Sequence, residues 1–347
     1  MYKKVAVGNF DIPFEYGVNL YSSGVGEHIW AETTAIDFQS LGFETYLRRG
    51  DEYYDLLSKQ IINKKDIDIF NTVHISYYDR LVAENVPQIA LTYFPVCEDG
   101  SIWWKNPNSK TIIAHQYYSD INAQTKHFTG HDYVIPFCPF SHAITNNPIN
   151  NKTIFWTSKM GLHPDYSGKT FEIDIALFEW ISSMLSNGFN LIFTTHFEQN
   201  SHESVKYSIV ESDIYKKHLS KYEDKIIFLK NVNYSDMLEI LGKSKIVINR
   251  RYVDNSFGGM PVEAAFYNIP TVVNGTSAFD NLKDKLYTFA YNPSYALDYV
   301  QYLDKLVSDD KYYTNYGSIY NSFINKYHGI EAFSKVVNHL FDVLYRK

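Results

Sequence analysis

The stretch that decides the fold is Lys245-Ile246-Val247-Ile248-Asn249-Arg250-Arg251-Tyr252-Val253-Asp254-Asn255-Ser256-Phe257-Gly258-Gly259-Met260-Pro261-Val262-Glu263-Ala264-Ala265. Residues 246–248 are apolar and β-branched, as in a buried strand of a parallel sheet, and Gly258-Gly259-Met260-Pro261 then leads into a helix. A helix N-terminus offers free N–H donors and the positive end of the helix dipole, and glycines let a phosphate or sugar approach them. The stretch therefore predicts either a ligand site at the end of a strand or a glycine cap on a buried helix.

Length and composition indicate two globular domains. The chain has 347 residues, of which 45% are apolar and 20% charged, and a single compact core rarely grows that large. Cys97 and Cys138 show neither a metal-binding spacing nor a disulfide framework, which favours a reducing cytoplasm. No apolar run reaches the roughly 20 residues of a membrane helix, and the N-terminus lacks the apolar core of a signal peptide, so we expect no integral membrane segment.

Charge is divided unevenly along the chain. Residues 1–150 hold 11 Lys and Arg against 17 Asp and Glu, a net charge of −6, and the remaining residues carry a net charge of −1. An acidic first half is the opposite of the basic footprint that nucleic acids and anionic lipids select. The sequence therefore argues against a nucleic-acid or membrane-surface partner.

The first half alternates short apolar runs with helical patterns, as a doubly wound parallel sheet requires. Its opening unit is a strand, a loop containing Ser23-Gly24-Val25-Gly26, and a helix; the spacing is not the dinucleotide fingerprint G-x-G-x-x-G. We predict strands at 3–8, 45–47, 67–70, 88–92, 111–114 and 133–135, and helices at 29–41, 52–62 and 117–127.

The second half repeats this alternation after a Pro- and Asn-rich connection, residues 136–152. Ser235 is the predicted N-cap of one helix, and apolar residues at helical spacing predict a last helix over 330–345. The other predicted elements are strands at 153–157, 190–195, 226–229, 246–248 and 270–273, and helices at 171–186 and 235–241.

Four stretches together resemble one known protein family. They are Ser23-Gly24-Val25-Gly26-Glu27-His28, Tyr133-Val134-Ile135-Pro136, Phe155-Trp156-Thr157-Ser158-Lys159 with Lys169 downstream, and Ser256 to Val273. Their order is similar to that in the large retaining branch of the GT-B glycosyltransferases, which includes the glycogen synthases and the group 1 bacterial sugar transferases. The resemblance covers nearly the whole chain.

The resemblance implies an α/β fold of the GT-B type, with two Rossmann-like, doubly wound parallel-sheet domains facing a cleft. Residues 1–145 would bind the acceptor, residues 152–329 would bind the nucleotide sugar, and helix 330–347 would pack back on the N-terminal domain. The implied activity is a hexosyl- or pentosyltransferase that moves a sugar from a nucleotide diphosphate to an acceptor hydroxyl, with retention and without metal or cofactor. A UDP-sugar is the expected co-substrate, and the acceptor is left open among glycans, proteins, small molecules and modified DNA bases.

The resemblance also implies roles for individual residues. Glu263 would accept hydrogen bonds from the nucleotide ribose, while Lys159 and Lys169 would neutralise the donor diphosphate. Two ammonium groups and helix N–H donors would stabilise the charge that grows on this leaving group in the transition state. His74 lies nearest to a family histidine that contacts the donor sugar. Together with the two lysines and Asn255 it completes the catalytic candidates, and the other donor-binding candidates are Gly24, Gly26, Arg250, Arg251, Phe257, Gly258, Gly259 and Met260.

Two sites depart from the family pattern. Asn255 stands where the family has a glutamate; it can hydrogen-bond a donor hydroxyl but cannot act as a nucleophile, and Asp254 is the adjacent acid. Arg250 and Arg251 stand where the family has a small residue or proline. They either bind a phosphate or a charged donor sugar, or form surface salt bridges.

Three alternatives remain open at this point. An inverting enzyme would need a base beside the acceptor, for which Asp11 or Glu27 could serve. A nucleotide-sugar 2-epimerase shares the two-domain architecture but needs several acidic residues around C2 of the sugar. A sugar-binding module without activity would leave the donor unchanged.

Overall fold

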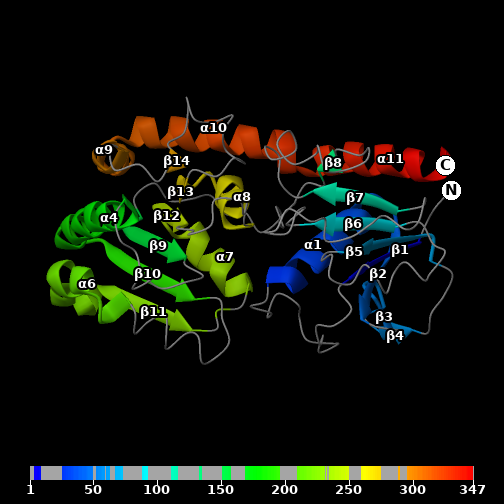
Figure 1. Ribbon diagram of the computed structural model, residues 1–347, viewed down its shortest axis with the longest axis horizontal. Coiled ribbons are helices and arrows are strands. Elements are labelled where there is room, and N and C mark those ends of the chain that lie inside the picture. Colours follow the sequence, from blue (N-terminus) through cyan, green and yellow to red (C-terminus); the bar gives the residue numbers. More distant parts are fainter. Residues whose placement is uncertain are drawn as a thin grey trace. The chain divides into compact units, whose positions relative to one another are not determined.

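The computed structural model divides the chain into two compact units (Figure 1). Unit 1 comprises residues 1–140 and 325–347, and unit 2 comprises residues 141–324. The residues described are 4–8, 26–49, 52–58, 60–62, 67–72, 88–92, 111–115, 133–134, 151–157, 169–195, 209–230, 232, 234–249, 259–274, 288–289 and 295–346.

Unit 1 is built on an eight-stranded sheet with the order β4-β3-β2-β1-β5-β6-β7-β8. Six of its strands are parallel and confirm the predicted ones: β1 (Lys4–Gly8), β2 (Glu44–Arg49), β5 (Ile69–Thr72), β6 (Gln88–Thr92), β7 (Thr111–His115) and β8 (Tyr133–Val134). The first strand lies inside the sheet, with β2 on one side and β5 on the other. The sheet therefore grows outward from β1 in both directions, as in a doubly wound fold.

The helix predicted over 52–62 is wrong. These residues form β3 (Glu52–Asp55) and β4 (Gln60–Ile62), an antiparallel hairpin that extends the sheet beyond β2. The turn explains the difference, because the Asp55 side chain accepts hydrogen bonds from the Leu57 N–H and the Ser58 hydroxyl, both at 2.9 Å. This local bonding reverses the chain where a helix would have continued. The helix predicted at 117–127 lies outside the described residues.

Helix α1 (Gly26–Ser40) packs on β1 and β2 and carries one side of an aromatic cluster. Phe38 is fully buried, and its ring lies 5.2 Å from Phe333 and 6.2 Å from Phe341, centre to centre. Both partners belong to α11 (Ile330–Arg346), the predicted C-terminal helix. The apolar stripe of α11 is thus buried within unit 1.

Unit 2 contains a six-stranded, all-parallel sheet with the order β11-β10-β9-β12-β13-β14. The five strands predicted in this half are confirmed, and β14 is an addition. The strands are β9 (Thr153–Thr157), β10 (Asn190–Thr195), β11 (Ile226–Lys230), β12 (Ile246–Asn249), β13 (Thr271–Asn274) and β14 (Thr288–Phe289). Because β9, the first strand, lies beside β12, the fourth, the order of the strands reverses between these two.

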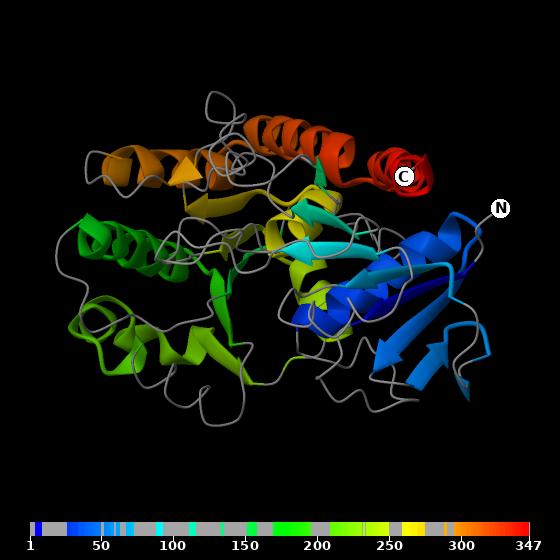
Figure 2. The same cartoon turned by 45° about the vertical axis from the view of Figure 1, so that its right-hand side comes forward.

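Helices cover both faces of this sheet. On one face, α4 (Lys169–Ser186) packs through Phe178 on Trp156 of β9, with ring centres 5.5 Å apart. It also contacts α6 (Asp213–His218) and α9 (Tyr295–Ser308). Right-handed crossovers place α7 (Tyr234–Gly242) and α8 (Gly259–Phe266) on the opposite face. These two helices contact each other and lie side by side in both views (Figures 1 and 2).

The predicted helices of unit 2 are confirmed, with one correction. α7 begins at Tyr234, so Ser235 lies inside the helix and is not its cap. Four further helices were not predicted from the sequence: the 3-10 helix η5 (Ser220–Lys225), α6, α9 and α10 (Asp310–His328).

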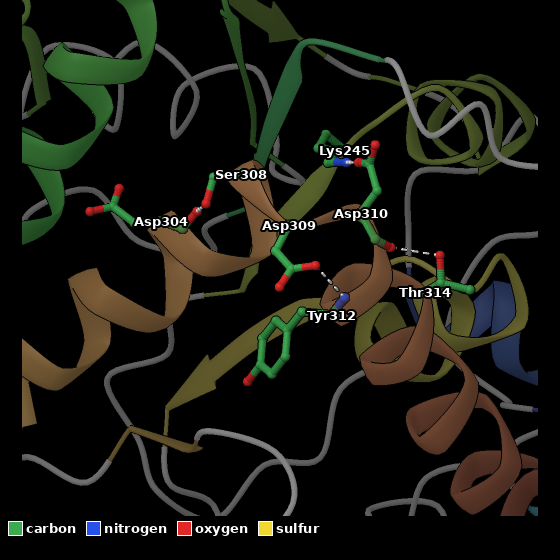
Figure 3. A network of polar contacts seen from close by, with 7 residues as sticks. All are labelled: Lys245, Asp304, Ser308, Asp309, Asp310, Tyr312 and Thr314. Atoms are coloured by element: carbon green, nitrogen blue, oxygen red, sulfur yellow. Dashed lines mark hydrogen bonds and ion pairs between the residues drawn. The ribbon is translucent and has the colours of Figure 1, made fainter.

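A polar network fixes the corner between α9 and α10 (Figure 3). The Asp309 carboxylate accepts from the Tyr312 N–H at 2.9 Å and caps α10. The ammonium of Lys245, whose side chain is only 4% exposed, lies 3.3 Å from Asp310 and 3.9 Å from the centre of the Tyr313 ring. Since Lys245 immediately precedes β12, this network ties α10 to the start of that strand.

Helix α10 also lies against the C-terminal end of α8. The Asn321 side chain donates to the carbonyl oxygen of Ala265 at 2.7 Å. A Cβ atom added to Gly317 would lie 2.5 Å from the Asn268 carbonyl oxygen. Gly317 thus allows the backbone of α10 to approach the backbone at Asn268, just after α8, and this contact fixes the C-terminal end of α8.

We expect Gly317→Ala to lower the free energy of unfolding by about 2 kcal/mol, because overpacked sites must move apart or strain. Ser318, one residue further along α10, is exposed, so Ser318→Ala is the matched control and should change stability by less than about 0.5 kcal/mol. Urea unfolding measures both. Equal stability of the two variants would show that α10 does not approach Asn268 this closely.

Candidate functional site

The candidate site lies at the carboxyl ends of β9 and β12 in unit 2. Asn249 pairs with Thr157 at the last rung between the two strands. Beyond this rung the chain leaves β9 toward α4 on one face and leaves β12 toward α8 on the other. Parallel α/β sheets bind ligands at this point of strand reversal, because the connections separate there.

Two helices begin beside this edge. α4 starts at Lys169 after connection 158–168, and α8 starts at Gly259 after connection 250–258. The first four N–H groups of a helix have no acceptor within the helix. In α8 the third residue is Pro261, which has no N–H, so Gly259, Met260 and Val262 supply the free donors. They can hydrogen-bond an anionic group held at this edge.

Glu263 is a charged residue of α8 close to this edge. It lies one turn inside α8 and is only 4% exposed. Burial raises the pKa of its carboxyl group to about 7 from an ordinary value of 4.5, while a hydrogen bond from the Tyr234 hydroxyl acts in the opposite direction. Burial and the charge of Glu263 together raise the pKa of Tyr267. The carboxyl group is therefore a desolvated acceptor that lies close to two tyrosines.

Tight packing makes α8 a firm support for this carboxyl group. The apolar residues of α8 are at most 8% exposed, and two alanines let the helix lie close to β12 and β13. A helix packed on several sides has few alternative positions, so a side chain that it carries is placed precisely. The buried residues are Met260, Val262, Ala264, Ala265 and Phe266.

Five of the predicted site residues lie among the described residues. Glu263 and Met260 are buried on α8, and the Met260 side chain, 7% exposed, belongs to the core. Gly259 begins α8, Lys169 begins α4 and Gly26 begins α1. The remaining candidates lie outside the described residues: Gly24, His74, Lys159, Arg250, Arg251, Asn255, Phe257 and Gly258, together with the alternative acids Asp11 and Asp254. Lys159, Arg250 and Arg251 follow the ends of β9 and β12 within two residues.

Two buried polar residues were not among the residues predicted from the sequence. Tyr234, 3% exposed, is the first residue of α7, and its hydroxyl group lowers the pKa of Glu263. The signal available was its place directly after β11, where the chain returns from the carboxyl end of a strand. Glu32 of α1 in unit 1 is 7% exposed, and burial raises its pKa to about 8. Its signal was a carboxylate close to the apolar positions Ala31 and Ala35.

No group of three or more His, Cys, Asp or Glu side chains in the described part of the chain could hold a metal ion. Among the helices described, none is both long enough and apolar enough to cross a membrane.

Known structures resemble the whole chain at low sequence identity. Sucrose-phosphate synthase from Thermosynechococcus elongatus matches 99% of this chain and 99% of its own, with a TM-score of 0.67 and 8% identity. An alpha-glucosyltransferase in complex with UDP and a 13-mer DNA containing a HMU base matches 99% of this chain and 100% of its own, with a TM-score of 0.60 and 12% identity.

A third structure is longer than this chain. S. aureus TarM, in complex with fondaparinux, alpha-GlcNAc-glycerol and UDP, matches 84% of this chain with a TM-score of 0.55 and 14% identity. The match spans 61% of the length of TarM. No known protein family and no curated protein matches the sequence. The chain thus has the GT-B fold that these structures share, which confirms the predicted fold class.

Proposed function

We propose that this chain, whose fold is GT-B, is a glycosyltransferase that takes a sugar from a nucleoside diphosphate, with UDP-sugar as the donor. The observation that carries the proposal is the buried Glu263 carboxyl group on α8, beside the carboxyl ends of β9 and β12. A carboxyl group that burial has removed from water is suited to accept hydrogen bonds from the two neutral hydroxyl groups of a ribose. The free N–H donors at the start of α8 suit the diphosphate. UDP in two structures of the same fold supports the choice of nucleotide.

The reaction breaks the bond between the anomeric carbon and the diphosphate oxygen and forms a bond from that carbon to the acceptor oxygen. The acceptor hydroxyl proton goes to the departing phosphate. In this proposal Lys159 and Lys169 bind the diphosphate as its negative charge increases. The N–H donors at the start of the helix also stabilise this charge. Cations from the chain replace a metal, so we propose a metal-independent enzyme that retains the anomeric configuration.

A thermal-shift panel of nucleoside diphosphates and their sugars tests the donor assignment. Ligands that bind only the folded state raise its melting temperature in proportion to the logarithm of concentration over Kd. We expect UDP to raise the melting temperature of the protein and uridine alone to do so far less, since it lacks the diphosphate. If UDP, GDP, ADP and dTDP all leave the melting temperature unchanged, the proposed donor site is wrong.

Retention and metal independence have their own measurements. With an α-linked donor, α-linked product would support retention and β-linked product would overturn it. Activity that survives EDTA would support a metal-independent reaction, and activity that only added magnesium or manganese restores would contradict it. Release of an epimerised nucleotide sugar without acceptor would replace the proposal with an epimerase.

The acceptor is proposed to be other than DNA, because residues 1–150 carry a net charge of −6. A protein that neutralises several phosphates loses affinity steeply as salt increases. Filter binding of a short duplex between 50 and 200 mM salt checks this point. Tight binding that weakens by about a thousandfold over this range would favour DNA instead.

A further inference from the structure

Asn321 of α10 donates a hydrogen bond to the helix that carries Glu263. Its side-chain amide, which is part-buried, lies 2.7 Å from the carbonyl oxygen of Ala265, the last residue but one of α8. Each residue advances a helix by about 1.5 Å, so the bonded carbonyl lies within one turn of the Glu263 backbone. A shift of this end of α8 therefore moves Glu263 with it.

The turn that ends α8 is held by the same region of α10. The Asn268 N–H donates to the same Ala265 carbonyl oxygen at 3.0 Å. Asn268 itself has a φ of 57°, in the left-handed region that often ends a helix. Its carbonyl oxygen lies so close to Gly317 that an added Cβ atom would be 2.5 Å away. The Asn321 bond and the Gly317 contact thus fix one tight turn from one neighbouring helix.

The position of α10 is itself well determined. On its buried side, Tyr313 is 3% exposed and Tyr320 is 2% exposed. At its start, Asp310 lies 3.3 Å from the ammonium group of Lys245. A helix packed and bonded in this way has few alternative positions, so the Asn321 amide is a fixed donor.

A helix as short as α8 depends on its neighbours for its exact position. It has eight residues, and isolated helices of that length are not stable in water, so packing places it. Its apolar contacts with β12 and β13 resist separation but are not directional. A hydrogen bond has a preferred distance and angle. The Asn321 bond therefore limits how far α8 can slide along the sheet.

We propose that Asn321 is a positioning residue for the nucleotide: its amide holds the C-terminal end of α8 and thereby sets the place of the Glu263 carboxyl group and of the N–H donors at the start of the helix. The inference rests on the proposed function and deepens it. Asn321 acts through α8 and does not itself touch the nucleotide. Loss of the amide donor should weaken nucleotide binding, because ligand-binding groups that move out of place bind less tightly.

Calorimetric titration with UDP tests this in two variants of Asn321. Asn321→Leu keeps the approximate size of the side chain but removes the donor, and UDP binding should weaken by about tenfold. Asn321→Asp keeps the shape but places a carboxylate oxygen against the Ala265 carbonyl oxygen, so it should bind UDP more weakly than Asn321→Leu. A side chain that only filled space would give the opposite order, because Asp matches Asn more closely in shape.

Two control variants separate the position of α8 from the stability of the protein. Asn315 is exposed on the same helix, so Asn315→Leu should leave UDP affinity unchanged. Asp304→Ala removes the acceptor of the Trp180 indole N–H, a bond of 2.7 Å between α9 and α4. It should lower the free energy of unfolding without changing UDP affinity. Urea unfolding compares the stabilities, and each titration uses a temperature at which the variant is folded.

Gly317→Ala is a second route to the same displacement, because the added methyl group pushes the Asn268 turn away from α10. It should also weaken UDP binding, and it tests the inference even if a variant of Asn321 does not fold. Wild-type affinity in Gly317→Ala would contradict the inference.

A double variant with Glu263→Gln locates the effect on α8. Asn321→Leu should weaken UDP binding less in the Glu263→Gln protein than in the wild type, because part of its effect acts through Glu263. Equal losses in the two proteins, unchanged affinity in the variants of Asn321, or an equal loss in Asp304→Ala would overturn the inference. If the wild type itself does not bind UDP, the proposed function fails, and the two failures are thus distinguishable.

Discussion

Glu263→Ala is expected to weaken UDP binding by about 100-fold without destabilising the protein. Hydrogen bonds to a charged group contribute about 1.5–3 kcal/mol each, and a loss of about 2.7 kcal/mol corresponds to 100-fold in affinity. The free energy of unfolding should stay level or increase at pH 8, because the buried carboxylate is costly to ionise, as its raised pKa shows. Stability that is kept or increased, together with lost UDP affinity, is what replacement of a ligand-binding residue should produce.

Two variants separate this effect from a general disturbance of α8. Glu263→Gln keeps the shape of the side chain but removes the charge, so it should bind UDP with intermediate affinity. Glu239→Gln on α7 changes an exposed glutamate and should leave affinity unchanged. Calorimetry gives the affinities, and urea unfolding gives the stabilities. If Glu263→Ala binds UDP with the affinity of the wild type, Glu263 does not contribute to the UDP site.

Glu32→Gln should remove a large pH-dependent loss of stability from unit 1. The pKa of Glu32 is about 8 in the folded protein against an ordinary value of 4.5. A group whose pKa is raised on folding binds its proton more tightly in the folded state. Its contribution is fully present below pH 4.5 and is lost as pH increases to about 8. Each pKa unit corresponds to about 1.4 kcal/mol, so the difference between 4.5 and about 8 corresponds to a full loss of about 5 kcal/mol.

The free energy of unfolding of the wild type should therefore fall relative to Glu32→Gln between pH 5 and pH 8. Glu263 also lowers the free energy of unfolding as pH increases, because burial raises its pKa. His328, whose burial lowers its pKa to about 3, lowers the free energy of unfolding only as pH falls below 6.5. Both groups are present in the two proteins, so the difference isolates Glu32. Urea unfolding at several pH values measures it. A constant difference across this range would mean that Glu32 is ionised and stabilised in the folded protein.

Most of the parallel sheet strands could be predicted because their signal is local. Residues 246–248 are β-branched and are followed in the sequence by the Gly258-Gly259 pair, and the structure has β12 over 246–249 and starts α8 at Gly259. Helix α11 could be predicted for the same reason, because its apolar residues recur at helical spacing within one short segment. The helix prediction over 52–62 was wrong because the hairpin depends on one side chain, Asp55, which accepts a hydrogen bond from the turn.

Helices α9 and α10 were missed because their sequences are polar and rich in tyrosine. The buried face of α10 includes Tyr313, Tyr316 and Tyr320 in place of aliphatic residues. The site was partly predictable: Gly259 and Glu263 follow a family pattern, so their place on α8 could be expected. The effect of Tyr234 on Glu263 and the burial of Glu32 depend on elements far apart in the sequence, so the local signals beside each residue were not enough to predict them.

Hydrogen–deuterium exchange of the protein with and without saturating UDP tests the central claim most directly, because it locates the ligand. Backbone amides that bind a ligand, or that the ligand covers, exchange more slowly. We predict slower exchange in peptides that cover residues 250–266, the connection after β12 and most of α8, and in those around residues 158–170. Protection confined to unit 1, or unchanged exchange in residues 250–266 at saturation, would contradict the account.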